Sequence, residues 1–204
     1  MDAGPAELRV LGCLIEKQRT TPEQYPLSVN ALRLACNQAT NRDPVVDYDE
    51  PTIREALTEL SRRGWVRLAS GPGSRAVKYR HLFDDALSLS DAEVSLLAVL
   101  MLRGAQTAAE LKQRVERLHR FASTAEVSET LHRLAERELA VLLPRRPGER
   151  EERWAQLLGG GDSHTETRPA PPLGLRADLE GRVRSLEERV AALEDTVGRG
   201  SSAS

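Results

Sequence analysis

Aromatic side chains are scarce in this chain of 204 residues, which contains two Trp, three Tyr and two Phe. Aromatic residues contribute much of the buried area in sandwich-like cores, so their scarcity disfavours an all-β sandwich. The cores must instead be built from Leu, Val and Ala. This composition favours helix-rich packing in one or two small domains.

The sequence also lacks a surplus of charge of either sign. Lys and Arg number 29 and Asp and Glu number 31, which gives a formal net charge of −2. The chain as a whole therefore lacks the strongly basic character of many nucleic-acid-binding proteins. Acidic and basic residues are equal in number in residues 1–85 and again in residues 86–160. Any contact with DNA would therefore depend on a local patch.

Cysteine and long apolar runs are also rare. The two cysteines, Cys13 and Cys36, and the lack of a signal peptide fit a reducing cytoplasm. No apolar run approaches the ~20 residues needed to span a bilayer. We therefore expect a cytoplasmic protein that does not cross a membrane.

Residues 51–81 predict a helix followed by a β-hairpin. One stripe of the helix is formed by the apolar residues Ile53, Ala56, Leu57 and Leu60. Pro51 suits the first helical turn, and Gly64 suits a left-handed residue just beyond the last turn. The spacing of apolar residues then changes from a period of 3.6 residues to a period of 2 over residues 65–69 and 76–80. This change predicts two strands joined by a Gly-rich turn.

Two further helices are predicted ahead of this unit. An apolar face over residues 5–18 predicts a buried first helix, and two prolines make residues 20–28 an extended segment. Ser28 is a suitable N-cap for a second helix over residues 29–36. A helix, an extended segment, a second helix, a long connection, a third helix and a hairpin follow the order of a winged helix. We assign this first winged helix to residues 1–85.

A second winged helix is predicted over residues 86–158. Three predicted helix starts carry capping-box pairs, which are Ser90 with Glu93, Thr107 with Glu110 and Ser123 with Glu126. An offset of 74 residues relates Ile53 to Val127, Leu60 to Leu134 and Trp65 to Leu139. This internal repeat predicts two tandem winged helices, and hence a mainly α protein with small β-hairpins.

The last quarter of the chain predicts a linker and a coiled coil. Residues 159–174 have the composition of a flexible linker, and residues 199–204 that of a disordered tail. Residues 175–198 form a short heptad array, whose a and d positions are Leu179, Val183, Leu186, Val190, Leu193 and Val197. Val at a with Leu at d favours a parallel homodimer. The alternative is an amphipathic helix that folds back onto the rest of the chain.

Three segments resemble the YceH-like bacterial proteins, a family of unknown function. These segments are LGCLIEKQRTTPEQYPLSVNALRLACNQATNRDPV at residues 11–45, VSLLAVLMLRGAQTAAEL at residues 94–111 and FASTAEVSETLHRLAERE at residues 121–138. The heptad tail is similar as well, so the resemblance covers nearly the whole chain. It implies a tandem winged-helix architecture and does not imply an activity.

Basic residues gather at the end of the predicted third helix and on the hairpin. Between Leu60 and Phe83 there are six Lys and Arg residues and no Asp or Glu. Such a patch is typical of contacts with phosphates. Alternatively, the charges only keep the hairpin edges from pairing with other strands. With polar residues of the helix added, the predicted nucleic-acid-binding set is Thr52, Arg54, Thr58, Arg62, Arg63, Arg67, Arg75, Lys78 and Arg80.

The predicted third helix is nevertheless poorly suited to reading bases. Carboxylates lie at its start and beside its apolar stripe, namely Asp49, Glu50, Glu55 and Glu59. They stabilise the helix dipole at its N-terminus but would repel phosphate. We therefore expect phosphate contacts to outnumber base contacts, and binding to be moderate and sensitive to salt.

A polar block over residues 20–42 has two interpretations. Amide side chains can recognise a ligand or a partner through paired donors and acceptors. Asn and Gln clusters in long loops more often satisfy the backbone of the loop itself. The residues concerned are Thr21, Gln24, Tyr25, Asn30, Asn37, Gln38, Asn41 and Arg42.

The sequence does not indicate enzymatic chemistry. Cys13 and Cys36 lie where buried small apolar residues are expected, and the four histidines share no metal-ligand spacing with them. The Gly-rich turn at residues 71–74 lies between strands, whereas a phosphate-binding loop would precede a helix. We expect no enzyme activity, cofactor or metal. The leading prediction is a DNA-binding homodimer with a regulatory role; the alternative is a protein-interaction scaffold in a chromosome-associated or other assembly.

Overall fold

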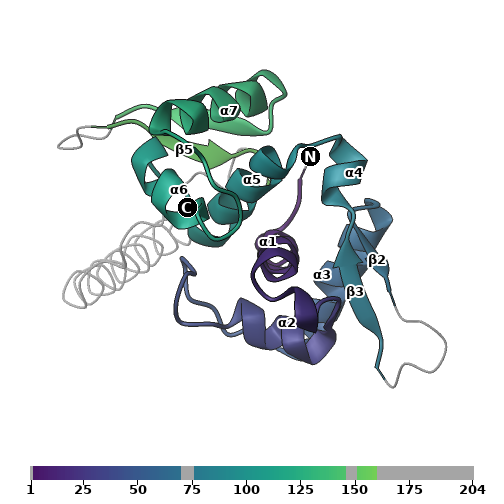
Figure 1. The fold of residues 1–204 in the computed structure, drawn as a ribbon. Coiled ribbons are helices and arrows are strands. Elements are labelled where there is room, and N and C mark those ends of the chain that lie inside the picture. The colour runs from purple at the N-terminus through teal and green to yellow at the C-terminus, as the bar shows by residue number, and fades with distance from the viewer. Residues whose placement is uncertain (1, 70–75, 146–150, 160–204) are drawn as a thin grey trace, which may run out of the picture. The chain divides into compact units, whose positions relative to one another are not determined.

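The computed structural model describes residues 2–69, 76–145 and 151–159 (Figure 1). These residues are mainly helical, with two small antiparallel sheets. No helix among them is long and apolar enough to cross a membrane. The predicted linker from residue 160 onward, the coiled coil with all six a and d residues, and the tail lie outside the described residues. The same is true of Arg75 and the turn at residues 71–74.

Among the described residues, the first half of the chain forms four α-helices and a three-stranded sheet. In chain order its elements are α1 (Pro5–Thr20), the 3₁₀ helix η1 (Pro22–Gln24), β1 (Leu27–Ser28), α2 (Val29–Cys36), α3 (Glu50–Arg62), β2 (Val66–Leu68), β3 (Lys78–His81) and α4 (Phe83–Leu87). The strand order is β1-β3-β2, with both pairs antiparallel. The extended segment predicted before α2 therefore contributes the third strand of the sheet.

The second half repeats three helices followed by a hairpin. Its elements are α5 (Asp91–Arg103), α6 (Ala108–Val115), α7 (Thr124–Glu136), β4 (Ala140–Leu143) and β5 (Arg153–Gln156). β4 and β5 pair antiparallel as a sheet of two strands. Among the described residues, the six predicted helices and the pairing of the predicted strands are thus confirmed, although the strands of the first hairpin are shorter than predicted. Trp65 lies outside β2 because its backbone N–H donates to the Leu60 carbonyl at the end of α3, at 3.0 Å. Its ring packs edge-to-face on Phe83, with 5.1 Å between ring centres.

Helix ends follow the local chemistry of the sequence. Ser28 caps α2 by accepting from the Ala31 N–H, and Gly64 follows α3 with a φ of +74°. The capping boxes at the starts of α5 and α6 are confirmed. In the third predicted capping box, at the start of α7, only one of the two hydrogen bonds is formed as predicted. The Glu126 carboxylate that should accept from the Ser123 N–H accepts instead from Ala122, one residue earlier.

Both halves contribute to one buried core. α1 packs against α2 and α3 of its own half and also against α5 of the second half (Figure 1). The residues Val10, Leu11, Cys13, Leu14 and Ile15 of α1 are completely buried. α5 is buried along nearly its whole length because it is covered by elements of both halves. The boundary predicted after residue 85 falls within α4.

Candidate nucleic-acid interface

The outer face of the β2–β3 hairpin carries three of the predicted basic residues. Arg67 on β2 lies directly opposite Arg80 on β3, and Lys78 lies two residues before Arg80. The neighbouring pair, Val66 and His81, is buried. Because successive side chains of a strand point to opposite faces, Arg67, Lys78 and Arg80 share the face away from the core.

The closeness of these positive charges is unfavourable for the stability of the hairpin. Like charges at directly opposite positions of an antiparallel pair are destabilising. Arg67 is exposed, and Lys78 and Arg80 are half-buried. In the part of the chain that the structure describes, neither Arg67 nor Arg80 forms an ion pair, and the buried Nε of Arg80 has no hydrogen-bond partner there. This arrangement suits a surface that meets an anion.

His81 fixes the position of β3 against α1. Its Nε2 contacts the side-chain oxygen of Gln18, and its backbone N–H donates to the Tyr25 hydroxyl at 2.8 Å. Burial lowers the pKa of His81 to about 4, against the opposing effect of Asp84, whose carboxylate lies 3.4 Å from Nδ1. Arg80 adds to the lowering. The imidazole is therefore neutral at pH 7, and the positive charge of the hairpin lies on its outer face.

On α3 the predicted contact residues are engaged within the helix. Arg54 forms an ion pair with Glu50 at 2.6 Å, and Arg62 forms one with Glu59. The Thr52 hydroxyl donates to Asp49, and the Thr58 hydroxyl donates to the Arg54 carbonyl. The exposed Glu55 adds a negative charge. The face of α3 is therefore almost neutral, as the carboxylates in its sequence indicated.

Arg63 links the end of α3 to α1 and to the N-terminal residues. Its Nε donates to Glu7 of α1 at 3.1 Å, and its Nη2 donates to the Asp2 carbonyl at 2.7 Å. The guanidinium also lies 5.6 Å from the centre of the Trp65 ring. Arg63 thus serves as a link between α1 and the end of α3, a role that the charge pattern alone did not reveal.

Two residues of the polar block, Asn37 and Arg42, hydrogen-bond to the protein itself at the two ends of the long connection between α2 and α3. Asn37 donates to the Tyr48 carbonyl and accepts from the Tyr48 N–H, each at 2.9 Å. Arg42 is buried; it donates to the Ala35 carbonyl at 3.1 Å and to both carboxylate oxygens of Glu16. Orphan carbonyls at a helix end need such donors. These contacts favour the structural interpretation of the block.

Arg9 was not predicted to be buried and hydrogen-bonded because it lies in an otherwise apolar stretch of the sequence. Arg9 is 4% exposed and donates to the carbonyls of Cys36, at 3.0 Å, and Pro44, at 2.6 Å. A lone arginine among buried apolar residues of a helix was the available signal, since a buried guanidinium needs partners. Cys13 and Cys36 are buried free thiols next to this network. Arg103, Arg114 and Arg117 were not predicted as site residues either.

Comparison with known proteins places the chain in one family. The model of the family described as "Protein of unknown function, DUF480" matches residues 4–149. The chain belongs to this family. It is also 47% identical over 195 residues to the UPF0502 protein YceH of Salmonella typhimurium, of Salmonella typhi and of Salmonella agona. The matches cover 92% of this chain and 91% of each relative. The resemblance to the YceH-like family is confirmed, and none of these names assigns an activity.

Proposed function

We propose that the chain is a DNA-binding protein of two tandem winged helices that contacts phosphates through the β2–β3 hairpin. The observation that carries the proposal is the position of Arg67 directly opposite Arg80 on the outer face of that hairpin. Two cations at opposite positions repel each other, and an anion bound between or above them replaces this repulsion with attraction. DNA phosphates supply such anions in regular succession.

The order of elements supports the winged-helix assignment. Three helices followed by a hairpin occur in each half, and β1 joins the first hairpin as a third strand. In such a module the third helix and the hairpin lie on one side. α3 and β2–β3 occupy these positions in the first half, and α7 and β4–β5 occupy them in the second.

The balance of charges favours backbone contacts over base reading. Arg54 and Arg62 of α3 are already paired with Glu50 and Glu59, whereas Arg67 and Arg80 have no such partner among the described residues. Phosphate contacts position a protein on DNA without specifying a sequence. If three phosphates are contacted, the logarithm of affinity falls with that of salt concentration with a slope of about −2.7.

The proposal is tested by fluorescence anisotropy with a labelled DNA duplex at about 50 mM salt. Reversing one exposed charge on the hairpin, Arg67→Glu, should weaken binding about tenfold because a phosphate contact becomes a repulsion. The matched control is Arg120→Glu, which reverses another exposed arginine, in the second half of the chain, and should leave affinity within about twofold. Absence of binding by the native chain, or equal affinity of the two variants, would contradict the proposal.

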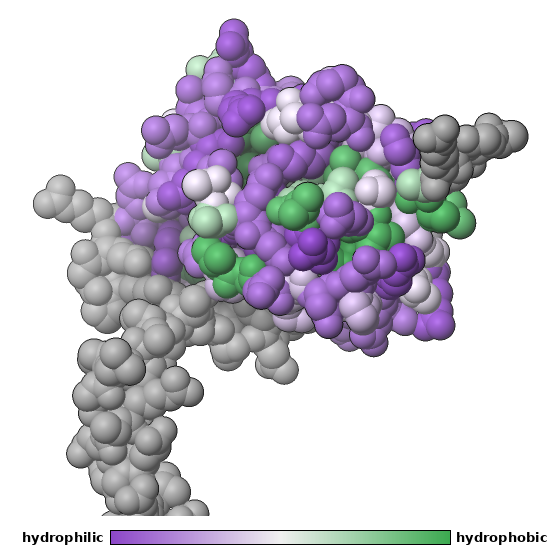
Figure 2. Space-filling view, turned by 90° about the horizontal axis from the view of Figure 1, so that it is seen from below, coloured by the Kyte–Doolittle hydropathy of each residue, from purple (hydrophilic) through white to green (hydrophobic). Residues whose placement is uncertain are grey.

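Exposed apolar residues favour the second candidate, a protein-interaction scaffold. Leu68 and Val77 of the same hairpin region are 61% and 51% exposed, and Leu34 and Val45 are exposed to a similar degree. Figure 2 shows that apolar surface on the face seen from below is divided into small patches within a largely hydrophilic surface. Scattered patches of this kind support a docking surface less strongly than one continuous patch would. A partner captured through Leu68 that survives nuclease treatment, with no DNA binding, would favour the scaffold.

The remaining parts of the proposal follow from the sequence. The chain works as a binding protein without a catalytic step, in the cytoplasm, and with a regulatory role. Residues 175–198 join two copies through a parallel coiled coil. Two copies would place two basic hairpins on one DNA molecule, which raises the overall affinity beyond that of a single contact.

A further inference from the structure

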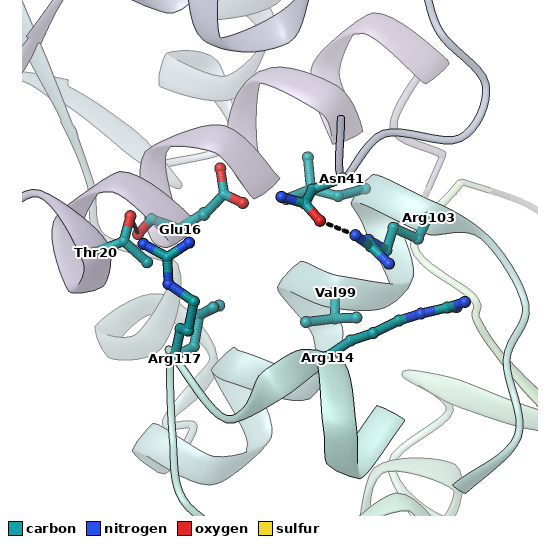
Figure 3. A pocket seen from close by; sticks show the side chains of 9 residues that line it. Glu16, Thr20, Asn41, Val99, Arg103, Arg114 and Arg117 are labelled. Atoms are coloured by element: carbon teal, nitrogen blue, oxygen red, sulfur yellow. Dashed lines mark hydrogen bonds between the residues drawn. The ribbon is translucent and has the colours of Figure 1, made fainter. Parts of the chain in front are cut away.

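A small cavity lies where α1 meets α5 and α6. It has a volume of about 60 Å³, and its nine lining residues are Glu16, Thr20, Asn41, Val99, Leu102, Arg103, Arg114, Arg117 and Leu118. Figure 3 shows Arg117 on one side, beside Thr20 and Glu16, and Arg103 on the other side, beside Asn41. Val99, Leu102 and Leu118 give the cavity an apolar part. The site thus combines residues of both halves of the chain.

The lining has more positive than negative charge. Three of its nine described residues are arginines, and Glu16 is the one carboxylate among them. Both oxygens of Glu16 already accept from Arg42, with the shorter contact at 2.6 Å. Arg42 therefore compensates much of the charge of Glu16, and Glu16 forms no ion pair with Arg103 or Arg117 among the described residues.

The arginines differ in what they contact. Arg114 turns away from Arg117 in Figure 3, because its guanidinium bonds to Gln106 at 2.6 Å and pairs with Glu110 at 3.2 Å. Arg103 donates to the Asn41 side chain, and Arg117 is exposed. Within the described residues, neither Arg103 nor Arg117 has an acidic partner. Two guanidinium groups thus flank the cavity without an ion pair among the described residues.

The surroundings of Arg103 show that positive charge is concentrated here. Burial and the neighbouring charges of Arg114 and Arg42 lower the pKa of Arg103, although Glu16 and Asp43 act in the opposite direction. Placing several cations together in a partly buried site costs free energy unless an anion accompanies them. An anion in the cavity would remove that cost.

We propose that this cavity binds the phosphate group of a small phosphorylated metabolite. A water molecule needs about 10–15 Å³ of such space, so 60 Å³ accommodates a group of several heavy atoms. Guanidinium groups hold phosphate oxygens through paired, charge-assisted hydrogen bonds. Arg103 and Arg117 supply these bonds from two sides.

An adjoining cavity has room for the rest of the ligand. Its volume is about 460 Å³; it shares Arg103 and Arg114 with the first cavity, and Asp43, Thr107 and Glu110 also line it. Carboxylate, hydroxyl and guanidinium groups together favour a neutral, hydroxyl-rich moiety over a second anionic one. The ligand class is therefore a sugar phosphate or a similar monophosphate ester.

Isothermal titration calorimetry of the full chain without DNA tests the proposal. Ribose 5-phosphate should bind saturably with a Kd of about 1 mM or tighter, inorganic phosphate more weakly, and ribose or succinate not measurably. Absence of binding by both phosphate compounds, or succinate binding as tightly as ribose 5-phosphate, would overturn it. If inorganic phosphate binds as tightly as ribose 5-phosphate, the role given to the adjoining cavity is wrong and free phosphate is the ligand.

Two variants and a matched control locate the binding. Arg117→Gln and Arg103→Gln should each weaken the binding of ribose 5-phosphate at least tenfold. Arg120→Gln, which removes a nearby arginine that pairs with Glu116 outside the cavity, should leave it unchanged. Equal binding by all three variants would place the anion elsewhere and overturn the assignment. Since no DNA is present, the result is independent of the outcome for the β2–β3 hairpin.

Discussion

Gly12 on α1 lies directly against Leu102 on α5. A Cβ atom at position 12 would be 2.9 Å from Leu102 Cγ and 3.3 Å from Met101 Cβ. Real side chains do not tolerate the shorter of these distances, so the two helices approach as closely as they do because residue 12 has no side chain. This contact joins the two halves of the chain.

The close approach predicts that Gly12→Ala destabilises the protein. Alanine in a helix is ordinarily more stable than glycine by about 0.5–1 kcal/mol. Here the added methyl group must displace buried Leu102, and overpacking costs about 1–3 kcal/mol. We expect a net loss of about 1–2 kcal/mol in the free energy of unfolding, measured by urea titration. Ser61→Ala, at an exposed position of α3, is the control; an unchanged midpoint for Gly12→Ala would show that α1 and α5 separate easily.

The ion pair between Arg42 and Glu16 predicts a larger effect. The Arg42 side chain is fully buried and the Glu16 side chain is 15% exposed. Removing one partner of a buried pair leaves the other charge uncompensated, which costs about 3–5 kcal/mol. Glu16→Gln should approach the lower end of that range in urea titrations. Glu116→Gln, which breaks an exposed pair with Arg120, should cost less than about 1 kcal/mol, and similar losses for the two variants would contradict the prediction.

His81 predicts a loss of stability on acidification. Its pKa is about 4 in the folded protein and 6.5 ordinarily. The unfolded chain therefore binds more protons between these values, so that stability is fully present above pH 6.5 and is lost as the pH falls towards 4. The difference corresponds to about 3 kcal/mol.

Replacing His81 isolates its contribution. In His81→Gln the free energy of unfolding should vary less between pH 6.5 and pH 4 than in the native chain, by about 3 kcal/mol at the acid end. Urea titrations at a series of pH values measure this difference. Parallel pH curves for the two proteins would show that His81 becomes charged in the folded state without penalty.

Local patterns in the sequence were sufficient to predict α1–α3, α5–α7 and the two hairpins, whereas η1, α4 and the pairing of β1 with β3 were not predicted. The helical spacing of Ile53 and Leu60, the N-caps at Ser28 and Ser90, and the glycine after α3 each depend on residues only a few positions apart. Such patterns do not depend on which distant segments pack against the helix. The length of β2 was overestimated because Trp65, which fits a strand pattern, donates its backbone N–H to the Leu60 carbonyl at the end of α3.

The candidate site was less predictable because ion pairs depend on distant segments. Arg63 pairs with Glu7, which is 56 residues away, and Arg42 pairs with Glu16. A count of charges between residues 60 and 83 includes Arg63 but could not include its partner Glu7. The cavity between α1 and α6 was not predicted for the same reason, since Arg117 and Thr20 are brought together only by the packing of both halves.

Glu55 predicts that DNA affinity can be raised as well as lowered. Its carboxylate is exposed on α3, where the proposed DNA contact would place phosphates. Glu55→Gln should strengthen binding about threefold to tenfold at 50 mM salt by removing a repulsion. Glu136→Gln, at an exposed position near the end of α7, is the control in the same anisotropy assay. If Glu55→Gln left affinity unchanged or reduced it, α3 would not face the DNA.

The heptad positions of residues 175–198, which lie outside the described residues, predict that assembly depends on Leu186. An aspartate at this central d position would be buried against its counterpart in a parallel coil, where two unpaired carboxylates are strongly unfavourable. A coil of about three heptads is only marginally stable. Leu186→Asp should therefore shift the mass in solution from dimer to monomer. Light scattering after size-exclusion chromatography measures this mass. Ser185→Asp adds the same carboxylate at the adjacent outward c position and should remain dimeric. A dimer that persists in Leu186→Asp would mean that the copies associate through residues 1–159, and the two basic hairpins would then be related by a different interface.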